Sequence, residues 1–133
     1  MRSVFNCLYC GETKKLEKNT FGKYCSNACQ GKQKRANYID EWKRGVRKGH
    51  VGKTLTISRP VRFYIFDKFK NRCCKCGWAK INEKTKSIPL QVNHIDGNAE
   101  NCLEENLELL CPNCHSLTSN FGNLNRGNGR RKR

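Results

Sequence analysis

Acidic and apolar side chains are both scarce in this chain of 133 residues. Asp and Glu number 11, only 36% of the residues are hydrophobic, and methionine occurs once. No run approaches the roughly 18 apolar residues that a membrane span needs. Residues 1–7 lack the apolar segment of a secretion signal. These absences argue against a membrane protein and a secreted disulfide scaffold, and they favour a cytoplasmic protein.

Basic side chains are abundant and unevenly distributed. Lys and Arg number 27, which gives a formal net charge of +16. Residues 30–72 hold 13 of them against three acids, residues 73–125 hold four against six acids, and residues 126–133 add five. A single charged run is usually a solvated face, but this asymmetry indicates a nucleic-acid partner. The candidate phosphate contacts are Lys32, Lys34, Arg35, Lys43, Arg44, Arg47, Lys48, Arg59 and Arg62.

The basic middle segment is predicted to form two helices. Apolar residues recur at three- and four-residue steps within residues 30–52, which predicts a helix that ends near Gly45. Trp42 is expected to anchor that helix in the core, and a glycine-rich linker follows it. Residues 58–71 are predicted to form the second helix, which the Ser58 side chain can cap.

Eight of the cysteines sort into two sets of four. In the first set, Cys7 and Cys10 form a C-x2-C pair, and Cys25 and Cys29 form a C-x3-C pair. A C-x2-C turn aims two thiolates at one tetrahedral zinc ion, and a second pair completes the site. We therefore expect a structural zinc site in the N-terminal part of the chain, with short strands near residues 23–24. Reduced cysteines without metal and two disulfides are the alternatives.

The second set consists of two further C-x2-C pairs. Its members are Cys73, Cys76, Cys111 and Cys114. Paired motifs of this kind are a strong signal for a second structural zinc site. Neither zinc ion needs an open coordination position, and binding both would supply folding free energy that so few apolar residues cannot. Cys74 and Cys102 are left over, and Cys74 is an alternative ligand to Cys73.

Residues 73–125 are predicted to form a hairpin followed by a helix. Alternating apolar residues predict a strand that begins at Leu90, and residues 107–110 predict a second strand. Pro112 suits the first turn of a helix. Together with the zinc sites, this order predicts a small, metal-stapled α+β fold.

Three polar residues stand out on this hairpin and helix. His94 ends the first strand, Asn106 precedes the second, and His115 follows the zinc ligand Cys114. Because adjacent helical residues point about 100° apart, Cys114 can serve the zinc ion while His115 faces the hairpin. Two imidazoles and an amide would then line one groove, with Asn93 beside His94. An imidazole with a pKa near 6.5 is a competent general base at neutral pH.

Residues 92–98 and 105–115 closely resemble the HNH endonucleases, above all the zinc-bearing group that is common in bacteriophages. The resemblance covers residues 59–122. It implies a ββα-metal (HNH) core framed by the four-cysteine zinc site, and hydrolysis of phosphodiester bonds in DNA. It also implies one catalytic divalent cation, Mg²⁺ or Mn²⁺. The expected products carry a 5′-phosphate and a 3′-hydroxyl.

The resemblance implies a role for each polar residue. His94 matches the general base that takes a proton from water, and Asn106 matches the Asn that holds the loop and orients the base. His115 matches a ligand of the catalytic cation. Asn93 stands where many members carry Asp or His as a further ligand, and a neutral amide binds a hard cation more weakly. Asn106 is the alternative to Asn93 as that ligand.

The chain is predicted to divide into four parts. They are an N-terminal four-cysteine zinc knuckle at 1–29, a basic helix and linker at 30–58, an HNH nuclease domain at 59–125 and a basic tail at 126–133. The N-terminal parts resemble a DNA-binding appendage. The expected partner is double-stranded DNA, with no membrane and no small-molecule cofactor. A monomer is expected, with a dimer as the alternative.

The resemblance favours a homing-type or nicking nuclease of a phage, acting in the cytoplasm of the bacterial host. Restriction and packaging nucleases are alternatives within the same class. Two other classes stay open. One is a non-catalytic zinc protein that binds DNA as a regulator through a decayed HNH core, which the neutral Asn93 favours. The other is an RNA-binding zinc protein, which fits the charge but has no need of His94.

Overall fold

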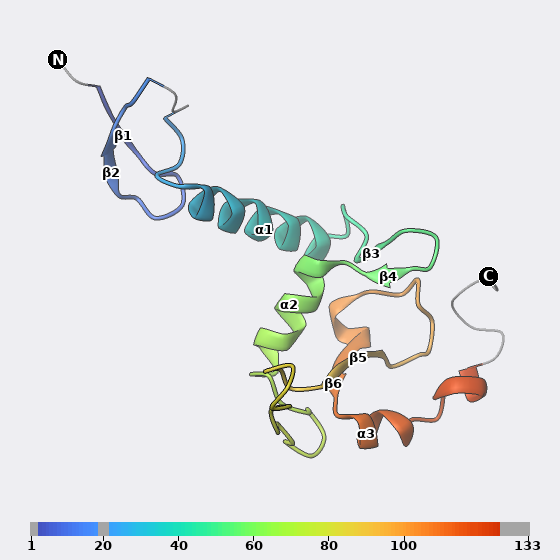
Figure 1. The fold of residues 1–133 in the computed structure, drawn as a ribbon. Coiled ribbons are helices and arrows are strands. Elements are labelled where there is room, and N and C mark those ends of the chain that lie inside the picture. The colour runs from blue at the N-terminus through green and yellow to red at the C-terminus, as the bar shows by residue number, and fades with distance from the viewer. Residues whose placement is uncertain (1–2, 19–21, 126–133) are drawn as a thin grey trace. The chain divides into compact units, whose positions relative to one another are not determined.

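The computed structural model describes residues 3–18 and 22–125, so the predicted basic tail at residues 126–133 lies outside the described residues. The described residues form a small α+β structure with three separate two-stranded antiparallel sheets (Figure 1). The chain divides into two compact units, Met1–Glu41 and Trp42–Arg133. Each unit contains one of the two predicted cysteine sets.

The first unit begins with a short hairpin. β1 (Val4–Asn6) pairs with β2 (Thr13–Lys15), and the C-x2-C knuckle lies in the connection between them. In the described ranges no strand forms near residues 23–24, and the Lys23 carbonyl instead accepts a hydrogen bond from the Leu8 amide at 2.8 Å. The predicted strand at this segment is wrong because the C-x2-C knuckle forms the turn of the hairpin, and the two strands lie on either side of that knuckle.

α1 (Asn27–Lys43) follows the second cysteine pair of the first unit. It begins before the predicted start at residue 30, so Cys29 lies in its first turn. It ends where the sequence predicts, because Gly45 adopts a φ of 77° and donates its amide to the Trp42 carbonyl at 3.1 Å. The final two residues of α1 belong to the second unit.

Trp42 is a buried anchor of the second unit, as the sequence predicts. Its indole N–H donates to the Cys102 carbonyl at 2.7 Å, and its ring meets Tyr64 edge-on with centroids 5.5 Å apart. Gly49 lies against this contact. A Cβ at Gly49 would stand 2.7 Å from the Cys102 Cβ and 2.8 Å from the Trp42 Nε1. Only a residue without a side chain fits there.

The predicted linker contains a small hairpin. β3 (His50–Val51) pairs with β4 (Thr56–Ile57), and the chain then enters α2 (Arg59–Lys68). Ser58 occupies the N-cap position of α2, but its side chain makes no capping hydrogen bond, and its buried hydroxyl has no partner among the described residues. The expected side-chain cap is therefore wrong. The Ser58 amide instead donates to the Gly49 carbonyl at 2.8 Å, which closes the hairpin.

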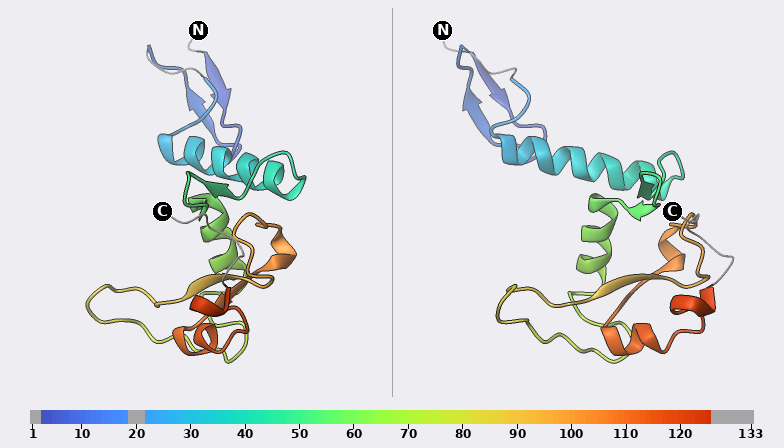
Figure 2. Two further views of the ribbon diagram at one scale, coloured as in Figure 1. Left: turned by 90° about the vertical axis from the view of Figure 1, so that its right-hand side faces the viewer. Right: turned by 45° about the vertical axis from the view of Figure 1, so that its right-hand side comes forward.

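The core of the second unit is built on the hairpin of β5 (Gln91–His94) and β6 (Leu107–Leu110). α2 packs against β6 and fully buries Val61 and Ile65. α3 (Pro112–Ser116) packs against both strands. The strand–strand–helix order matches the prediction, and Figure 2 shows that the chain between α2 and β5 forms a long loop.

The register of this hairpin decides which polar residues meet. Asn93 lies opposite Glu108, and His94 lies opposite Leu107. The Asn93 side chain meets Glu108 of β6, whereas the His94 side chain meets Cys102 in the loop that follows β5. Each therefore has its own neighbours.

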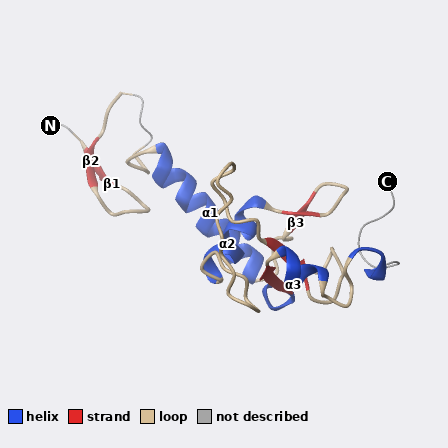
Figure 3. Cartoon of the chain, turned by 60° about the horizontal axis from the view of Figure 1, so that its bottom comes forward, coloured by secondary structure: helices blue, strands red, loops and turns tan. Residues whose placement is uncertain are grey.

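Much of the second unit is loop and turn (Figure 3). Two 3₁₀ helices lie within these loops, Glu104–Asn106 before β6 and Gly122–Asn125 after α3. Among the described residues, no helix has both the length and the apolar character needed to cross a membrane.

We expect Gly49→Ala to destabilise the second unit by about 1–3 kcal/mol, because the added methyl group displaces Trp42 or Cys102. The measurement is urea unfolding at a fixed zinc concentration. Tryptophan fluorescence reports on this unit because Trp42 and Trp78 both belong to it. Val46→Ala, at an exposed neighbouring position, is the control and should change the free energy of unfolding by less than about 0.5 kcal/mol. Equal effects would contradict the close packing at Gly49.

Candidate metal centres and active site

The first cysteine cluster lies in the first unit. The sulfur atoms of Cys7, Cys10, Cys25 and Cys29 all lie within 4.8 Å of one another. The Cys10 and Cys25 sulfurs are 3.6 Å apart, and the Cys25 and Cys29 sulfurs are 3.4 Å apart. A tetrahedral zinc ion with Zn–S bonds of about 2.3 Å has sulfur–sulfur edges of about 3.8 Å. The four thiols therefore fit one zinc ion.

The second cluster lies in the second unit and has the same geometry. Its members are Cys73, Cys76, Cys111 and Cys114, whose sulfur atoms lie within 4.8 Å of one another. Burial raises the pKa of Cys73, but backbone N–H groups, chiefly those of Cys111 and Cys76, outweigh burial and lower it to about 6. Zinc binds the thiolate form of cysteine. The backbone N–H groups of the knuckle therefore favour the form of Cys73 that the zinc ion needs.

The second cluster joins three elements of the fold. Its first cysteine pair follows α2, Cys111 follows β6 directly, and Cys114 lies on α3. The Cys74 amide donates to the Leu109 carbonyl at 2.9 Å, which ties the knuckle to β6, while the Cys74 thiol lies outside the cluster. A metal ion bound here would hold α3 against the hairpin.

His94 is the last residue of β5 and is half-buried. Its Nε2 lies 3.4 Å from the Sγ of Cys102, a buried residue in the loop that joins β5 to β6. Its carbonyl accepts hydrogen bonds from the Gly97 amide at 2.9 Å and from the Asn120 side chain at 3.5 Å. The loop and the segment after α3 thus both support the end of β5.

Asn106 is buried and closes the loop between β5 and β6. Its Nδ2 donates to Asp96 Oδ1 at 2.9 Å and to the Asn101 carbonyl at 2.7 Å, and its Oδ1 accepts from the Asp96 amide at 3.1 Å. Burial raises the pKa of Asp96, but hydrogen bonds from Asn101, Asn98 and Asn106 outweigh it and keep that pKa below its usual value. Asp96 therefore belongs to the turn.

Asn93 is buried and pairs with Glu108 on the neighbouring strand. Its Nδ2 donates to Glu108 Oε1 at 2.9 Å, and the Lys75 amine lies 3.8 Å from the same oxygen. An ionised carboxylate only accepts hydrogen bonds, so this contact orients the amide with Nδ2 toward Glu108. The Asn93 Oδ1 then carries the lone pairs that a cation needs.

His115 lies on α3, one residue after a cysteine of the second cluster. Its ring meets the Phe121 ring edge-on, with centroids 5.2 Å apart, and its amide donates to the Cys111 carbonyl at 2.9 Å. α3 packs against β5, which carries two of the other predicted site residues. The predicted site residues thus lie in one unit, on the hairpin and on the helix packed against it.

Asn93 and His115 are the predicted protein ligands of the catalytic cation. Within residues 3–18 and 22–125, the two cysteine clusters are the groups of three or more His, Cys, Asp or Glu that could hold a metal ion. A cation at Asn93 and His115 would therefore fill its other positions with water and phosphate oxygens. Mg²⁺ is usually bound through one or two carboxylates together with water and phosphate oxygens, so an imidazole and an amide are a weak donor set that depends on the phosphate.

Cys102 and Glu108 are neighbours of the site that sequence analysis does not identify. Cys102 reaches His94 because the loop folds back onto β5, and Glu108 reaches Asn93 because of the strand register. No spacing of residues in the sequence predicts either contact, since both depend on how separate segments pair.

The nine predicted DNA contacts are all exposed. In the second unit, the Lys43 amine lies 4.4 Å from the centre of the Tyr64 ring, and the Arg59 guanidinium lies 5.3 Å from that of Phe63. Contacts of this kind hold the aliphatic part of a basic side chain on the surface and keep its charge near solvent.

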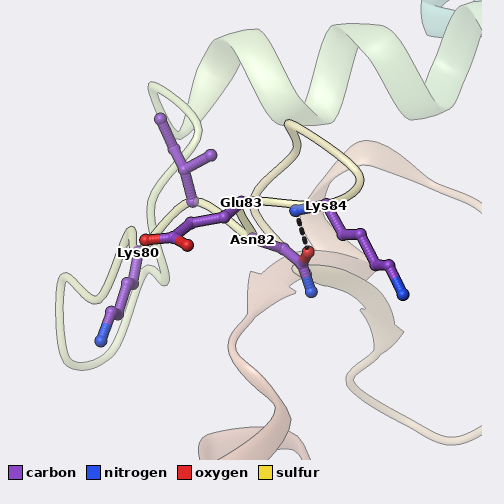
Figure 4. A pocket seen from close by; sticks show the side chains of 5 residues that line it. Lys80, Asn82, Glu83 and Lys84 are labelled. Carbon is purple, nitrogen blue, oxygen red and sulfur yellow. Dashed lines mark hydrogen bonds between the residues drawn. The ribbon is translucent and has the colours of Figure 1, made fainter.

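The described residues of the second unit line at least two cavities, and two of these differ in their lining. The larger, of about 570 Å³, is lined by Lys80, Ile81, Asn82, Glu83 and Lys84, none of which is a predicted site residue (Figure 4). The Asn82 side chain accepts the Lys84 amide at 2.9 Å and shapes this turn. The smaller cavity, of about 430 Å³, is lined in part by Trp42, Lys48 and Cys102.

Comparison with known proteins yields one partial similarity. A stretch of 57 residues, 43% of the chain, is 44% identical to the H-N-H endonuclease F-TflIV of Escherichia phage T5. The match covers 24% of that protein, so the chain spans about a quarter of the length of the curated relative it matches. No family model and no solved structure matches the chain. The similarity agrees with the resemblance to HNH endonucleases over part of the chain.

We expect each chain to bind two zinc ions, one in each cluster. Cys10→Ser removes one thiolate from a four-cysteine site and is expected to lower the zinc content from two to one. Cys74→Ser, outside both clusters, is the matched control and is expected to leave it at two. Mass-spectrometric metal analysis of the purified proteins gives the count. Loss of zinc in Cys74→Ser together with its retention in Cys73→Ser would instead assign Cys74 as the ligand.

Proposed function

We propose that this chain is a metal-dependent DNA endonuclease of HNH type. The arrangement of β5, β6 and α3 beside a four-cysteine cluster carries the proposal. It has His94 at the strand end, Asn106 closing the loop and His115 on the helix. The similarity of part of the chain to a phage H-N-H endonuclease supports the same class.

His94 acts as the general base in this proposal. A neutral imidazole accepts a proton from a water molecule, and the water oxygen attacks the phosphorus atom of the scissile phosphodiester. The bond between phosphorus and the 3′ oxygen breaks, and that oxygen takes a proton from solvent. The products carry a 5′-phosphate and a 3′-hydroxyl.

Asn93 and His115 would hold the divalent cation, Mg²⁺ or Mn²⁺. When bound, it neutralises charge on the phosphate and stabilises the leaving oxygen. Glu108 accepts a hydrogen bond from the Asn93 amide nitrogen, so the amide oxygen is left to bind the cation. The Asn106 oxygen accepts the Asp96 amide, which favours Asn93 over Asn106 as the ligand.

The remaining parts of the chain would frame the site and bind DNA. In this proposal both four-cysteine clusters hold structural zinc, residues 59–125 form the nuclease domain, and residues 1–58 form a DNA-binding part, of which residues 42–58 belong to the same compact unit as the nuclease domain. The exposed basic residues contact phosphates, and the partner is double-stranded DNA. One active site cuts one strand per binding event, so a monomer mainly nicks.

A homing-type or nicking nuclease of a phage, acting in the host cytoplasm, is the proposed biological role. A non-catalytic DNA-binding protein is the second candidate. The observation that favours it is the neutral Asn93 side chain, which pairs with Glu108 where many HNH enzymes place a metal-binding carboxylate or imidazole.

Cleavage of supercoiled plasmid at neutral pH with Mg²⁺ or Mn²⁺ tests the proposal. We expect the intact protein to nick the plasmid. His94→Ala should bind DNA and carry its zinc but cleave at least about 100-fold more slowly, because the general base is lost. His50→Ala, on β3 and outside the site, is the matched control and should cleave like the intact protein.

The outcome also separates the two candidates. Binding of plasmid by the intact protein without cleavage, under every divalent cation tried, would rule out the nuclease and favour the non-catalytic DNA-binding protein. Equal cleavage by His94→Ala and the intact protein, with zinc content unchanged, would remove His94 from the role of base.

Phosphate contacts predict a steep salt dependence of DNA binding. With about six to ten contacts, the logarithm of the binding constant should fall against the logarithm of salt concentration with a slope of about −5 to −9. Replacing Arg59 and Arg62 together by Ala should reduce the slope by about 2. Replacing Lys84 and Lys86 together by Ala is the control. Both lie in residues 73–125, which hold four basic residues against six acids, and the slope should stay unchanged. A slope near zero for the intact protein is incompatible with phosphate contacts by the basic segment.

A further inference from the structure

We propose that residues 120–125, which follow α3, form a strap that fixes the position of His94 relative to His115. Three side chains of this strap act as positioning residues, and none of them takes part in the proposed reaction. The inference rests on the proposed function in naming His94 as the general base and His115 as a ligand of the cation. The strap contacts both elements that carry these histidines, β5 and α3.

The first set of strap contacts lies at the end of β5 and the turn that follows it. The Asn120 Nδ2 donates to the Ile95 carbonyl at 3.1 Å and to the His94 carbonyl at 3.5 Å. The Asn125 Nδ2 donates to the Gly97 carbonyl at 2.7 Å. Two amide side chains therefore hold three carbonyl groups within four residues of the chain, beginning with that of the proposed base.

Close packing at Gly97 brings the strap within reach of this turn. A Cβ at Gly97 would overlap the Asn125 Oδ1 and would stand 2.8 Å from the Asn120 Nδ2. A residue without a side chain thus lets both amides approach the backbone of the turn. The Asn125 Oδ1 is buried without a hydrogen-bond partner among the described residues, so the contact of its Nδ2 with Gly97 is what orients this amide.

The second set of strap contacts lies on α3. The Phe121 ring meets the His115 ring edge-on, with centroids 5.2 Å apart. The Phe121 amide donates to the Thr118 carbonyl at 3.3 Å, and the Thr118 hydroxyl donates to the His115 carbonyl at 2.8 Å. Hydrogen-bonded turns thus connect His115 to Phe121. Because Phe121 directly follows Asn120, one short segment contacts both histidines.

The spacing of the two histidines matters for the proposed reaction. The base must bring its water to a phosphate that the cation holds, and a displacement of about 1 Å can lower the rate of such a step about 100-fold. α3 has only five residues, and His94 is the last residue of its strand. Contacts from one strap to both elements limit their movement relative to each other.

Two other roles fit the strap less well. A segment that covers the core would bury its apolar side chains, whereas Phe121 is 42% exposed and Leu124 is 71% exposed. A segment that grips DNA would carry basic residues, whereas residues 116–125 contain neither Lys nor Arg. The directed contacts with the turn and with His115 are thus the role that the geometry supports.

Cleavage kinetics of the zinc-loaded protein, well below its unfolding temperature, test the positioning role. We expect the double variant Asn120→Ala with Asn125→Ala to lower kcat by about 10- to 100-fold, because the base loses its position. KM for DNA should change less than about twofold, because the basic residues that contact phosphates are unchanged. Ser119→Ala and Leu124→Ala, at exposed positions of the same segment, are the matched controls and should keep the intact kcat.

Asn120→Asp separates hydrogen bonding from packing. Aspartate has the shape of asparagine, but an ionised carboxylate only accepts hydrogen bonds and so cannot bind the two carbonyl groups. We expect Asn120→Asp to lower kcat at least as much as Asn120→Ala does. Ser119→Asp adds the same charge at the exposed neighbouring position and should keep the intact kcat. An intact kcat in Asn120→Asp would contradict the role of its amide.

Amide hydrogen exchange by NMR tests the strap without any cleavage. The Ile95 amide donates to the Asn106 carbonyl at 2.8 Å, and the Gly97 amide donates to the His94 carbonyl at 2.9 Å. In the double variant we expect both amides to exchange at least about tenfold faster, because the turn opens more often. Phe121→Ala should shift the ring-proton signals of His115, since the neighbouring aromatic ring is removed. Leu124→Ala should change neither readout.

Zinc content and the amide spectrum establish whether each variant is folded, and Asn120→Asp carries the test if the double variant does not fold. Faster exchange with an intact kcat would reduce the strap to a structural support and overturn its positioning role. Unchanged exchange at Ile95 and Gly97 would show that the strap does not hold the turn. Either result would leave the proposed function standing. If the intact protein cleaves no DNA, the proposed function fails, and the exchange measurement still decides whether the strap holds the turn.

Discussion

The cluster of Cys73, Cys76, Cys111 and Cys114 is the constraint on which the second unit depends. It joins the end of α2 to the junction of β6 and α3. α3 has five residues, too few for a stable isolated helix. A chain that is only 36% hydrophobic has little apolar area with which to hold such a helix. Metal–thiolate bonds at the cluster can replace that area, so the placement of His115 depends on the cluster.

Polar contacts hold the loop between β5 and β6, where apolar packing is thin. Asn106 bonds to Asp96 and to the Asn101 carbonyl from inside the loop, and the Trp42 indole bonds to the loop's Cys102 from outside. A loop whose buried polar groups all find partners loses little free energy on burial and keeps one conformation. The end of β5, with the proposed base, is thereby supported by side-chain hydrogen bonds as well as by the sheet.

In the proposed reaction, the protein supplies only a few ligands to the cation. Asn93 and His115 are both neutral donors, so a divalent cation would bind weakly until the negatively charged phosphate completes its shell. DNA binding and cation binding would then favour each other. The exposed basic residues would supply the DNA affinity through phosphates, independently of base sequence. Glu108 helps by orienting an amide rather than by ligating the cation.

The sequence by itself determined the two cysteine sets, the strand–strand–helix order and the end of α1, because these follow from short-range spacing, alternation and turn chemistry. It misplaced the first strands and missed the hairpin of β3 and β4, since two- and three-residue strands exist only through their partners. The capping role expected of Ser58 failed because its hydroxyl is buried without a partner among the described residues. Only the tertiary structure decided that Cys102 meets His94 and that Glu108 meets Asn93. Loop closure and strand register bring these pairs together across 8 and 15 positions, and no local pattern in the sequence encodes either distance.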